Sequence, residues 1–448
     1  MSPSNTNGDI QRCESLLLQS PLLINTKSTV AKSTRLQRIK TIAKGFTKGA
    51  GLDKLTKSQK IGLDLIRVIS TFAVVLLHSG DDALVPITNN ADILRSYFVF
   101  PVPVFLALSF YLTSKSILVR GHLNLSKKLT RLLIPYAFFS GIYLFYDAIE
   151  ITDLSVLPYL QRVFAPLVAD PIGIVFLGEA YVHLYFFPLL IVGTVAMHYL
   201  SGWLKQRSVV QIIGLTVASA IAHHWLMMSG NEFIIEGPST AFQAFLPSIT
   251  NNPSLRLLAA YGALLIRCLP YIFLAFFIAS KTGNIGQGGT PQSHALAHTL
   301  SNTQAAQTQA KSAWSKRQKL IISWTCLGIT IFILTFQDPL SPVLRDILLA
   351  FLLLIFGLGI SHKIKHETFF ARIILAISQG SFGIYLIHHI YIGLFKKIEV
   401  FLPFYNEEVI TAGRIFTFAV LGFVISFITI KRLSQHIHQK RARQCLGL

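Results

Sequence analysis

Residues 61–80 read IGLDLIRVISTFAVVLLHSG, a run of twenty residues in which only a few side chains are polar or charged. A helix rises about 1.5 Å per residue, so about 20 apolar residues cross the roughly 30 Å hydrocarbon core of a bilayer. Backbone groups in lipid must satisfy their own hydrogen bonds, and a single apolar run can do so only as a helix. This stretch therefore predicts a membrane-spanning helix.

Nine more apolar stretches of similar length follow. They cover residues 96–118, 129–148, 181–200, 208–228, 255–280, 319–336, 343–362, 371–395 and 409–431. The stretch 154–177 is also apolar, but Pro158, Pro166 and Pro171 interrupt it, and we expect a folded external loop there. We therefore predict an all-α fold, a polytopic membrane helical bundle of about ten transmembrane helices.

The composition agrees with a membrane protein and excludes several other classes. The 448 residues are 52% hydrophobic and 13% charged, whereas soluble chains carry about 25% charged residues. This balance excludes a soluble DNA-binding domain, a disordered tail protein and a collagen-like fibre. The four cysteines are scattered without CxxC spacing and indicate neither a disulfide framework nor a zinc site. We expect no metal ion and no bound cofactor.

The net charge of +20 arises from 40 Lys and Arg against 20 Asp and Glu, and it is unevenly distributed. Alternate connections between the spans, together with both terminal segments, hold most of the basic residues, and the acidic residues gather in the opposite connections. Basic connections face the cytoplasm in most membrane proteins. We therefore predict that both termini are cytoplasmic and that the chain lies in the plasma membrane or bacterial inner membrane.

The same pattern divides the chain into segments. Residues 1–60 form a basic arm that we expect to be disordered, 61–431 form the membrane domain, and 432–448 form a short basic tail. Within the membrane domain, residues 281–318 read as a flexible cytosolic loop. We expect the arm to associate with anionic membrane lipid and not with nucleic acid, because it lacks interleaved aromatic residues and any reader motif. The oligomeric state stays open.

Charged residues inside a span are costly and are functional candidates by default. The first span contains Asp64, Arg67 and His78. Arg67 and His78 are eleven residues apart, so they share a helix face and lie about 16 Å apart along the axis. Asp64 lies one turn before Arg67 and can pair with it. The alternative is that Arg67 extends to the cytosolic headgroups and His78 is merely interfacial.

The ninth span carries a polar stripe. Ser378, Ser381, Tyr385 and His388 follow at i, i+3, i+7 and i+10 on one helix face. We expect His388 to lie at a depth similar to that of the histidine in the first span. His389 points about 100° away and is a weaker candidate. The alternative is a seam of hydrogen bonds between helices.

Other spans add further candidates. Glu179 and His183 lie four residues apart at the outer end of the fourth span, where the carboxylate could orient the imidazole and raise its basicity. Ser109 lies near the middle of the second span, and Arg131 lies at the inner end of the third. Arg267 lies deep in the sixth span, where it needs a partner or an anionic ligand.

Five short elements stand in one order along the membrane domain. They are Arg67-x10-His78, Val104-Phe105 with Ser109, Arg131 with Ile134-Pro135-Tyr136, Glu179 with His183-Leu184-Tyr185-Phe186, and Ser381 with Tyr385-Leu386-Ile387-His388. Together they resemble the signature of the acyltransferase-3 family of integral membrane acyltransferases, over about residues 60–431. Two positions differ from the family pattern: Phe110 stands where a Gly is usual, and Tyr185 where a Trp is usual.

The resemblance implies transfer of an acyl group, commonly acetyl, from a coenzyme A thioester. The implied partners are acetyl-CoA or another acyl-CoA as donor, membrane lipid, and a hydroxyl of a carbohydrate or glycolipid acceptor such as a surface polysaccharide or lipid-linked glycan. Such a reaction needs a base and a group that stabilises the oxyanion. The predicted catalytic residues are His78, as base or transient acyl carrier, with Glu179, His183 and His388. The predicted donor- or acyl-binding residues are Asp64, Arg67, Ser109, Arg131, Arg267, Ser381 and Tyr385.

Two other classes of function would also place polar residues inside the membrane. A secondary transporter needs a polar solute pathway, and a glycan flippase or polymerase shares the expected acceptor class. Many transporters are built from repeats, but spans one to five show no similarity to spans six to ten. An acyltransferase is therefore the favoured interpretation.

Overall fold

The computed structural model describes residues 57–81, 86–149, 156–228, 252–283, 316–336, 340–365, 367–399, 409–437 and 440–447. The predicted basic arm, apart from its last four residues, and most of the predicted 281–318 loop lie outside these ranges. The described residues are helical, with no β-strand among them beyond a single bridge between Ile87 and Ile410. The all-α prediction is confirmed.

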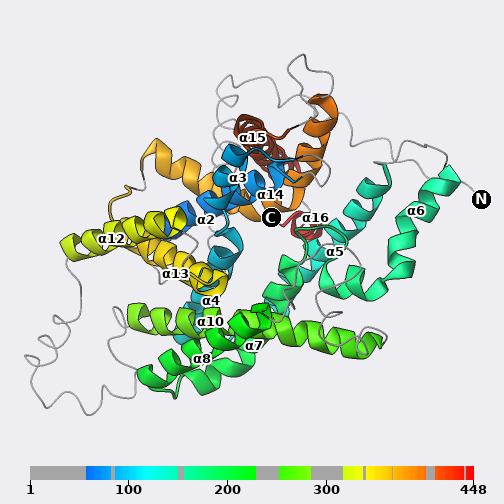
Figure 1. Cartoon of the computed structure of the whole chain (residues 1–448). Helices are drawn as coiled ribbons and strands as arrows, with labels where there is room; N and C mark the ends of the chain where they lie inside the picture. Colours follow the sequence, from blue (N-terminus) through cyan, green and yellow to red (C-terminus); the bar gives the residue numbers. More distant parts are fainter. Residues whose placement is uncertain are drawn as a thin grey trace, which may run out of the picture. The chain divides into compact units, whose positions relative to one another are not determined.

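Ten helices of the described residues are long and apolar enough to cross a membrane (Figure 1). They are α2 (Lys57–Ser79), α4 (Pro101–Arg120), α5 (Leu125–Ile149), α7 (Phe186–Leu204), α8 (Val209–Met228), α10 (Pro253–Gly283), α12 (Lys316–Thr335), α13 (Pro342–Ile360), α14 (Phe369–Glu399) and α15 (Ala412–His436). Each falls on one of the ten stretches identified in the sequence. The chain is therefore a polytopic membrane protein.

Shorter helices and turns lie between the spans. They correct two predictions, one about the loop at 154–177 and one about the start of the fourth span. The expected loop at 154–177 contains α6 (Val156–Ala169) and a π-helical turn, η2 (Gly173–Leu177). Pro158 lies in the first turn of α6, where no backbone N–H is needed, so it does not interrupt the helix. The fourth span begins at Phe186 and not at residue 181, because Gly178 adopts φ 84° and turns follow it. Two further short helices are α3 (Asn89–Ser96) and α16 (Lys440–Cys445).

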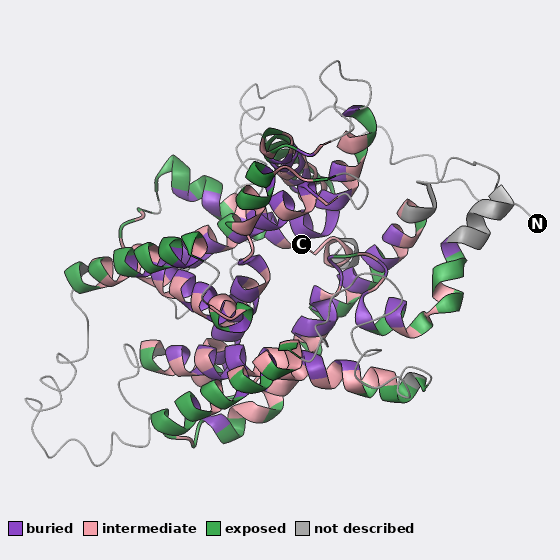
Figure 2. Cartoon of the chain, in the orientation of Figure 1, coloured by how far each residue is buried: buried purple, intermediate pink, exposed green. Residues whose placement is uncertain are grey.

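Helix α2 packs against four other spans, namely α4, α13, α14 and α15. Figure 2 shows buried residues along the helices of this region and more exposed residues along α8 and α12. The approach of α2 to α13 is close because glycines face each other there. A Cβ atom added at Gly62 would lie 1.9 Å from the carbonyl oxygen of Gly357. Small residues that let backbones approach are typical of helix pairs in membranes.

We expect Gly62→Ala to destabilise the protein by about 1–3 kcal/mol, because the backbone oxygen of Gly357 cannot move aside without moving α13. Gly328→Ala on α12 is the matched control, since a Cβ there meets nothing within 4 Å. The control is expected to leave the protein unchanged or slightly more stable. Thermal unfolding in detergent measures both, and an unchanged melting temperature for Gly62→Ala would contradict the close contact.

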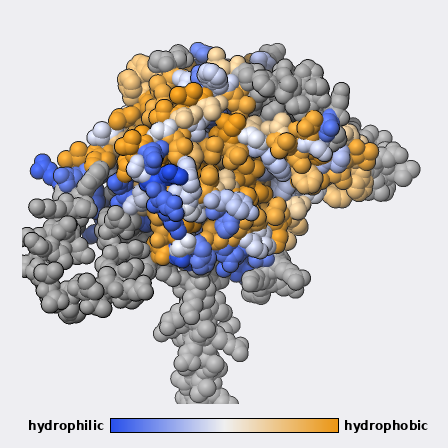
Figure 3. Space-filling model, turned by 90° about the horizontal axis from the view of Figure 1, so that it is seen from below, coloured by the Kyte–Doolittle hydropathy of each residue, from blue (hydrophilic) through white to orange (hydrophobic). Residues whose placement is uncertain are grey.

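The surface explains why the chain is so apolar. Large apolar side chains are exposed on the outer faces of the spans, for example Val210, Trp225 and Ile321. On the face that Figure 3 shows, apolar side chains cover much of the described surface, and hydrophilic residues gather in separate areas. In water such a surface would be unfavourable, whereas in lipid it is the expected one.

Candidate functional site: a buried histidine cluster

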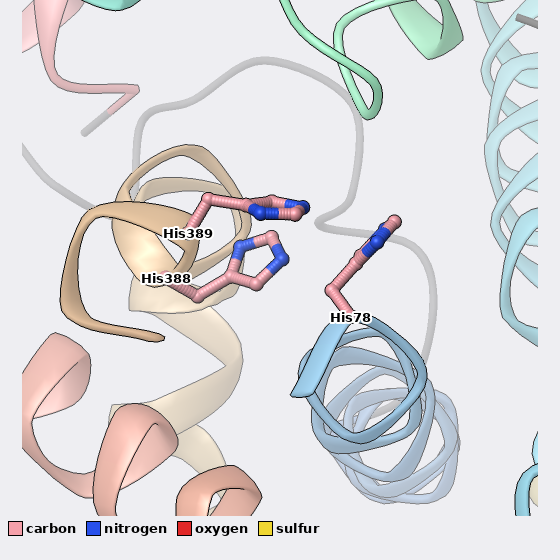
Figure 4. A group of neighbouring side chains, drawn as sticks. All are labelled: His78, His388 and His389. Carbon is pink, nitrogen blue, oxygen red and sulfur yellow. The ribbon is translucent and has the colours of Figure 1, made fainter. Parts of the chain in front are cut away.

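Four histidines from three parts of the chain come together. His78 lies at the end of α2, His183 in the turn before α7, and His388 and His389 on α14. The centroid of the His78 ring lies 4.3 Å from that of the His389 ring and 5.5 Å from that of the His388 ring. His183 lies 4.7 Å from His389 and 5.2 Å from His388. We call these four residues the histidine cluster; Figure 4 shows three of them.

His78 is the member of the cluster that is paired with a carboxylate. Its Nδ1 lies 2.6 Å from Oδ2 of Asp81. Arg95 donates a hydrogen bond to the other oxygen of Asp81 at 2.7 Å, and Lys396 bonds the Asp81 carbonyl oxygen. Burial raises the pKa of Asp81, but the hydrogen bond to His78 and the nearby positive charges outweigh it and hold the pKa below its ordinary value. Asp81 is therefore ionised at neutral pH.

The other three histidines are more deeply buried. His183 and His388 are fully buried and His389 is 6% exposed, whereas 18% of the His78 side chain is exposed. Burial, together with the neighbouring His388 and His78, holds the pKa of His183 well below its ordinary value. His183 is therefore neutral at physiological pH, and His78 is the cluster member that a substrate can reach.

Tyr385 connects two members of the cluster. Its hydroxyl donates a hydrogen bond to the backbone oxygen of His183, and its own carbonyl oxygen lies 2.7 Å from Nδ1 of His388. Ser381 lies one turn earlier and donates to the carbonyl oxygen of Ser378 at 2.9 Å. The polar stripe predicted on α14 thus contacts the turn before α7 at its C-terminal part.

Two tyrosines form a wall of the cluster. Tyr143 on α5 stacks on Tyr181 at 4.3 Å, and its hydroxyl donates to the backbone oxygen of Leu386. The Tyr181 ring lies 4.9 Å from His389. The sequence patterns did not single out either tyrosine. No local signal marks them, because α5 reaches α14 only through the packing of the bundle.

A second polar cluster joins α2 and α14. Nη1 of Arg67 donates to Asp64 Oδ1 at 3.0 Å and to Ser378 Oγ at 2.9 Å, and Ser378 donates to Asp64 at 2.6 Å. The predicted pairing of Arg67 with Asp64 is confirmed. Because Arg67 meets Ser378 and His78 meets His388, the two helices run parallel, and the two polar clusters lie about 16 Å apart along them.

The structure contradicts two predictions about this region. His389 was the weaker candidate by helical angle, but its ring lies nearest of the three to His78. Glu179 does not orient His183: both ring nitrogens of His183 lack a hydrogen-bond partner among the described residues. The i, i+4 relation holds only on a helix, and residues 178–185 form turns that begin at Gly178, which has φ 84°.

Glu179 belongs instead to an ionic cluster with Asp170 and Arg256. Nη2 of Arg256 lies 2.7 Å from Asp170 and 3.3 Å from Glu179. Burial raises the pKa of Glu179 to about 7; the charge of Arg256 lowers it in part, and the adjacent Asp170 raises it again. Burial beside a second carboxylate therefore leaves Glu179 partly protonated at neutral pH.

This raised pKa predicts a pH-dependent stability difference between the wild type and Glu179→Gln. The folded state binds the Glu179 proton more tightly than the unfolded state does. The contribution of this proton to the stability of the fold is therefore complete at acidic pH and is lost as the pH rises through about 7. We expect Glu179→Gln to melt on the order of a few degrees higher than the wild type at pH 8. The difference should shrink toward pH 5, and a constant difference across this range would contradict the shift.

Three other predicted residues do not reach the histidine cluster within the described part of the chain. Ser109 is half-buried on α4, and Arg131 is exposed on α5. Arg267 is half-buried on α10, with Tyr185, Tyr271 and Asp346 near it. The sequence-based role of these three in donor binding stays a prediction.

The fold and the cluster together define a class: a ten-span membrane protein with histidines and an aspartate gathered at one end of two parallel spans. Residues 60–431 match the family model of the acyltransferase-3 family, described as an acyltransferase domain. The chain therefore belongs to this family and is a membrane acyltransferase. No curated protein and no solved structure matches the chain.

Proposed function

We propose that the protein transfers an acetyl group from acetyl-CoA to a hydroxyl of a carbohydrate acceptor, such as a surface polysaccharide or a lipid-linked glycan. The observation that carries the chemistry is the pair of His78 and Asp81, 2.6 Å apart, within a buried cluster. The carboxylate can only accept, so Nδ1 of His78 carries the proton and Nε2 carries the lone pair. That arrangement suits a general base.

His78 acts first as a general base and then as a general acid. Its Nε2 takes the proton from the acceptor hydroxyl while the oxygen attacks the thioester carbonyl. The tetrahedral intermediate then breaks its C–S bond, and the coenzyme A thiolate receives the proton from the His78 imidazolium. Asp81 stabilises the imidazolium and holds the ring in one tautomer, as a carboxylate does in serine hydrolases. The product is an acetyl ester and free coenzyme A.

Arg67 is the proposed contact for the donor phosphates. Its two hydrogen bonds to described residues both use Nη1, and we propose that the other guanidinium nitrogens bind phosphate oxygens. The distance of about 16 Å from Arg67 to His78 along α2 is spanned by the extended arm between the phosphates and the thioester. Arg131 and Arg267 are proposed to add positive charge along this route, and Ser109, Ser381 and Tyr385 to line it.

The proposed acceptor side faces away from the cytoplasm. Basic connections favour cytoplasmic termini, which places Arg67 toward the cytosolic donor and His78 toward the outer surface of the cell membrane. Tyr143 and Tyr181 beside the cluster offer aromatic faces, on which the C–H groups of a sugar ring can pack. These features support a carbohydrate acceptor over a purely lipid one.

Purified protein, acetyl-labelled coenzyme A and isolated surface glycan test the proposal. We expect label in the glycan, and we expect mild alkali to release it, because an ester hydrolyses under conditions in which an amide persists. Label that resists alkali would contradict transfer to a hydroxyl. Uptake of a solute into vesicles without consumption of acetyl-CoA would contradict the proposed reaction altogether.

A further inference from the structure

The histidine cluster holds more imidazoles than proton transfer by His78 needs. One ring nitrogen from each of His78, His388 and His389 lies within 4.8 Å of the other two. Nε2 of His388 and Nε2 of His389 are buried and have no hydrogen-bond partner among the described residues. In Figure 4 the rings of His388 and His389 extend from α14 toward the ring of His78 on α2. Buried nitrogens without partners normally have a ligand to satisfy them.

Hydrogen bonds fix the lone pairs of two of these rings. Nδ1 of His78 faces the Asp81 carboxylate, and Nδ1 of His388 faces the carbonyl oxygen of Tyr385. Both oxygens can only accept, so both Nδ1 atoms carry protons and both Nε2 atoms carry lone pairs. Lone pairs directed into one space repel each other, and a cation between them removes the repulsion. Histidines that bind metals usually donate the other N–H to a carboxylate or a backbone carbonyl, as these two do.

We propose that His78, His388 and His389 bind one divalent transition-metal ion, with Zn²⁺ the best match, and that the bound ion stops acyl transfer. Zinc accepts imidazole nitrogens at about 2.0–2.1 Å in tetrahedral geometry, which places the ring centroids about 5 Å apart. The three centroid separations here are 4.3, 4.6 and 5.5 Å. Three histidines leave one position of the ion open for water.

His183 is not a ligand in this arrangement, although it lies beside the other three. Its ring stacks on His389 with an interplanar angle of 13°. The planes of stacked rings are parallel, and the nitrogen lone pairs lie in those planes. The lone pairs of His183 and His389 therefore cannot both point at one ion. His183 therefore supports the ring of His389 from one side.

The charges around the cluster set the expected affinity. Asp81 contributes a negative charge behind His78, but Arg95 and Lys396 both contact Asp81 and offset it. We expect micromolar binding for this reason, weaker than in structural zinc sites. His78 is the partly exposed member of the three, which gives the ion a route from the surface.

Inhibition rests on the proposed function. The Nε2 atom of His78 that takes the acceptor proton is the same atom that binds the ion, so a metal ion and an acceptor hydroxyl compete for it. Binding itself does not depend on that reaction and is measured without donor or acceptor.

Calorimetric titration of untagged, EDTA-stripped protein with Zn²⁺ tests the site. We expect one ion per chain, weaker binding by about 100-fold or more in His389→Gln, and by about 10–100-fold in Asp81→Asn. His198→Gln on α7 is the matched control, because His198 lies outside the cluster, and it should bind as the wild type does. Co²⁺ should give the visible absorption of a tetrahedral site, and His389→Gln should lose it.

The outcomes separate the two proposals. Equal Zn²⁺ affinity in the wild type and His389→Gln would overturn the metal site. Zinc bound at the site without loss of acetyl transfer would overturn the inhibitory role. Zinc bound at the site of a protein that transfers no acetyl group in EDTA would instead contradict the proposed function and leave the metal site standing.

Discussion

Replacing His78 with alanine is expected to lower the rate of acetyl transfer by about 10²–10⁴-fold, the usual contribution of a general base. His183, His388 and His389 cannot substitute for it, because all three are buried and none is paired with a carboxylate among the described residues. The assay uses purified protein, labelled acetyl-CoA and EDTA, so that metal binding does not affect the result. The loss should appear in kcat with little change in the KM of the donor.

Two further variants test whether the loss of activity is specific to His78 and to its carboxylate partner. His198→Ala removes a histidine from α7 outside the cluster and should retain wild-type activity. Asp81→Asn should lower kcat less than His78→Ala does, because the base remains but loses its fixed tautomer and its counter-charge. If His78→Ala transferred acetyl at the wild-type rate, the assignment of the base would be wrong.

Arg67→Ala is expected to raise the KM of the acyl donor by roughly 10–150-fold, the equivalent of losing a charged hydrogen bond worth about 1.5–3 kcal/mol. The same change leaves the Asp64 carboxylate without its cation, which should destabilise the protein by about 1–3 kcal/mol. The two effects must be separated, because an unstable protein also loses apparent affinity.

The double variant Asp64→Ala/Arg67→Ala separates them. Removing both partners leaves no unpaired charge, so the melting temperature should return most of the way to that of the wild type. The KM of the donor should stay raised, because the guanidinium is still missing. A double variant with both wild-type stability and wild-type KM would show that Arg67 acts only as the partner of Asp64.

The membrane helices could be located from the sequence because hydrocarbon imposes one simple rule. Each span needs a long apolar run, and all ten runs became helices. The shared face of Asp64 and Arg67 was also predictable, since a helix fixes which residues three or four positions apart are neighbours. The boundary of the fourth span was misplaced, because apolar residues continue through the turns before Phe186.

Contacts between distant segments were not predictable in the same way. Helical angle alone placed His389 away from the stripe on α14, but its ring contacts both His183 in the turn before α7 and His78 on α2. Glu179 lies four residues before His183, yet a left-handed Gly178 ends the π-helical turn, and the carboxylate meets Arg256 of α10 instead.

The sequence by itself determined the membrane fold, the number of spans and the face of α2 that carries Arg67 and His78, because apolar length and helical spacing are local properties of the chain. The tertiary structure decided which side chains meet His78. Asp81 lies three residues beyond it, but the remaining partners come from a turn and a helix more than a hundred residues away. Their convergence depends on the packing of α2 against α14, which no local pattern encodes.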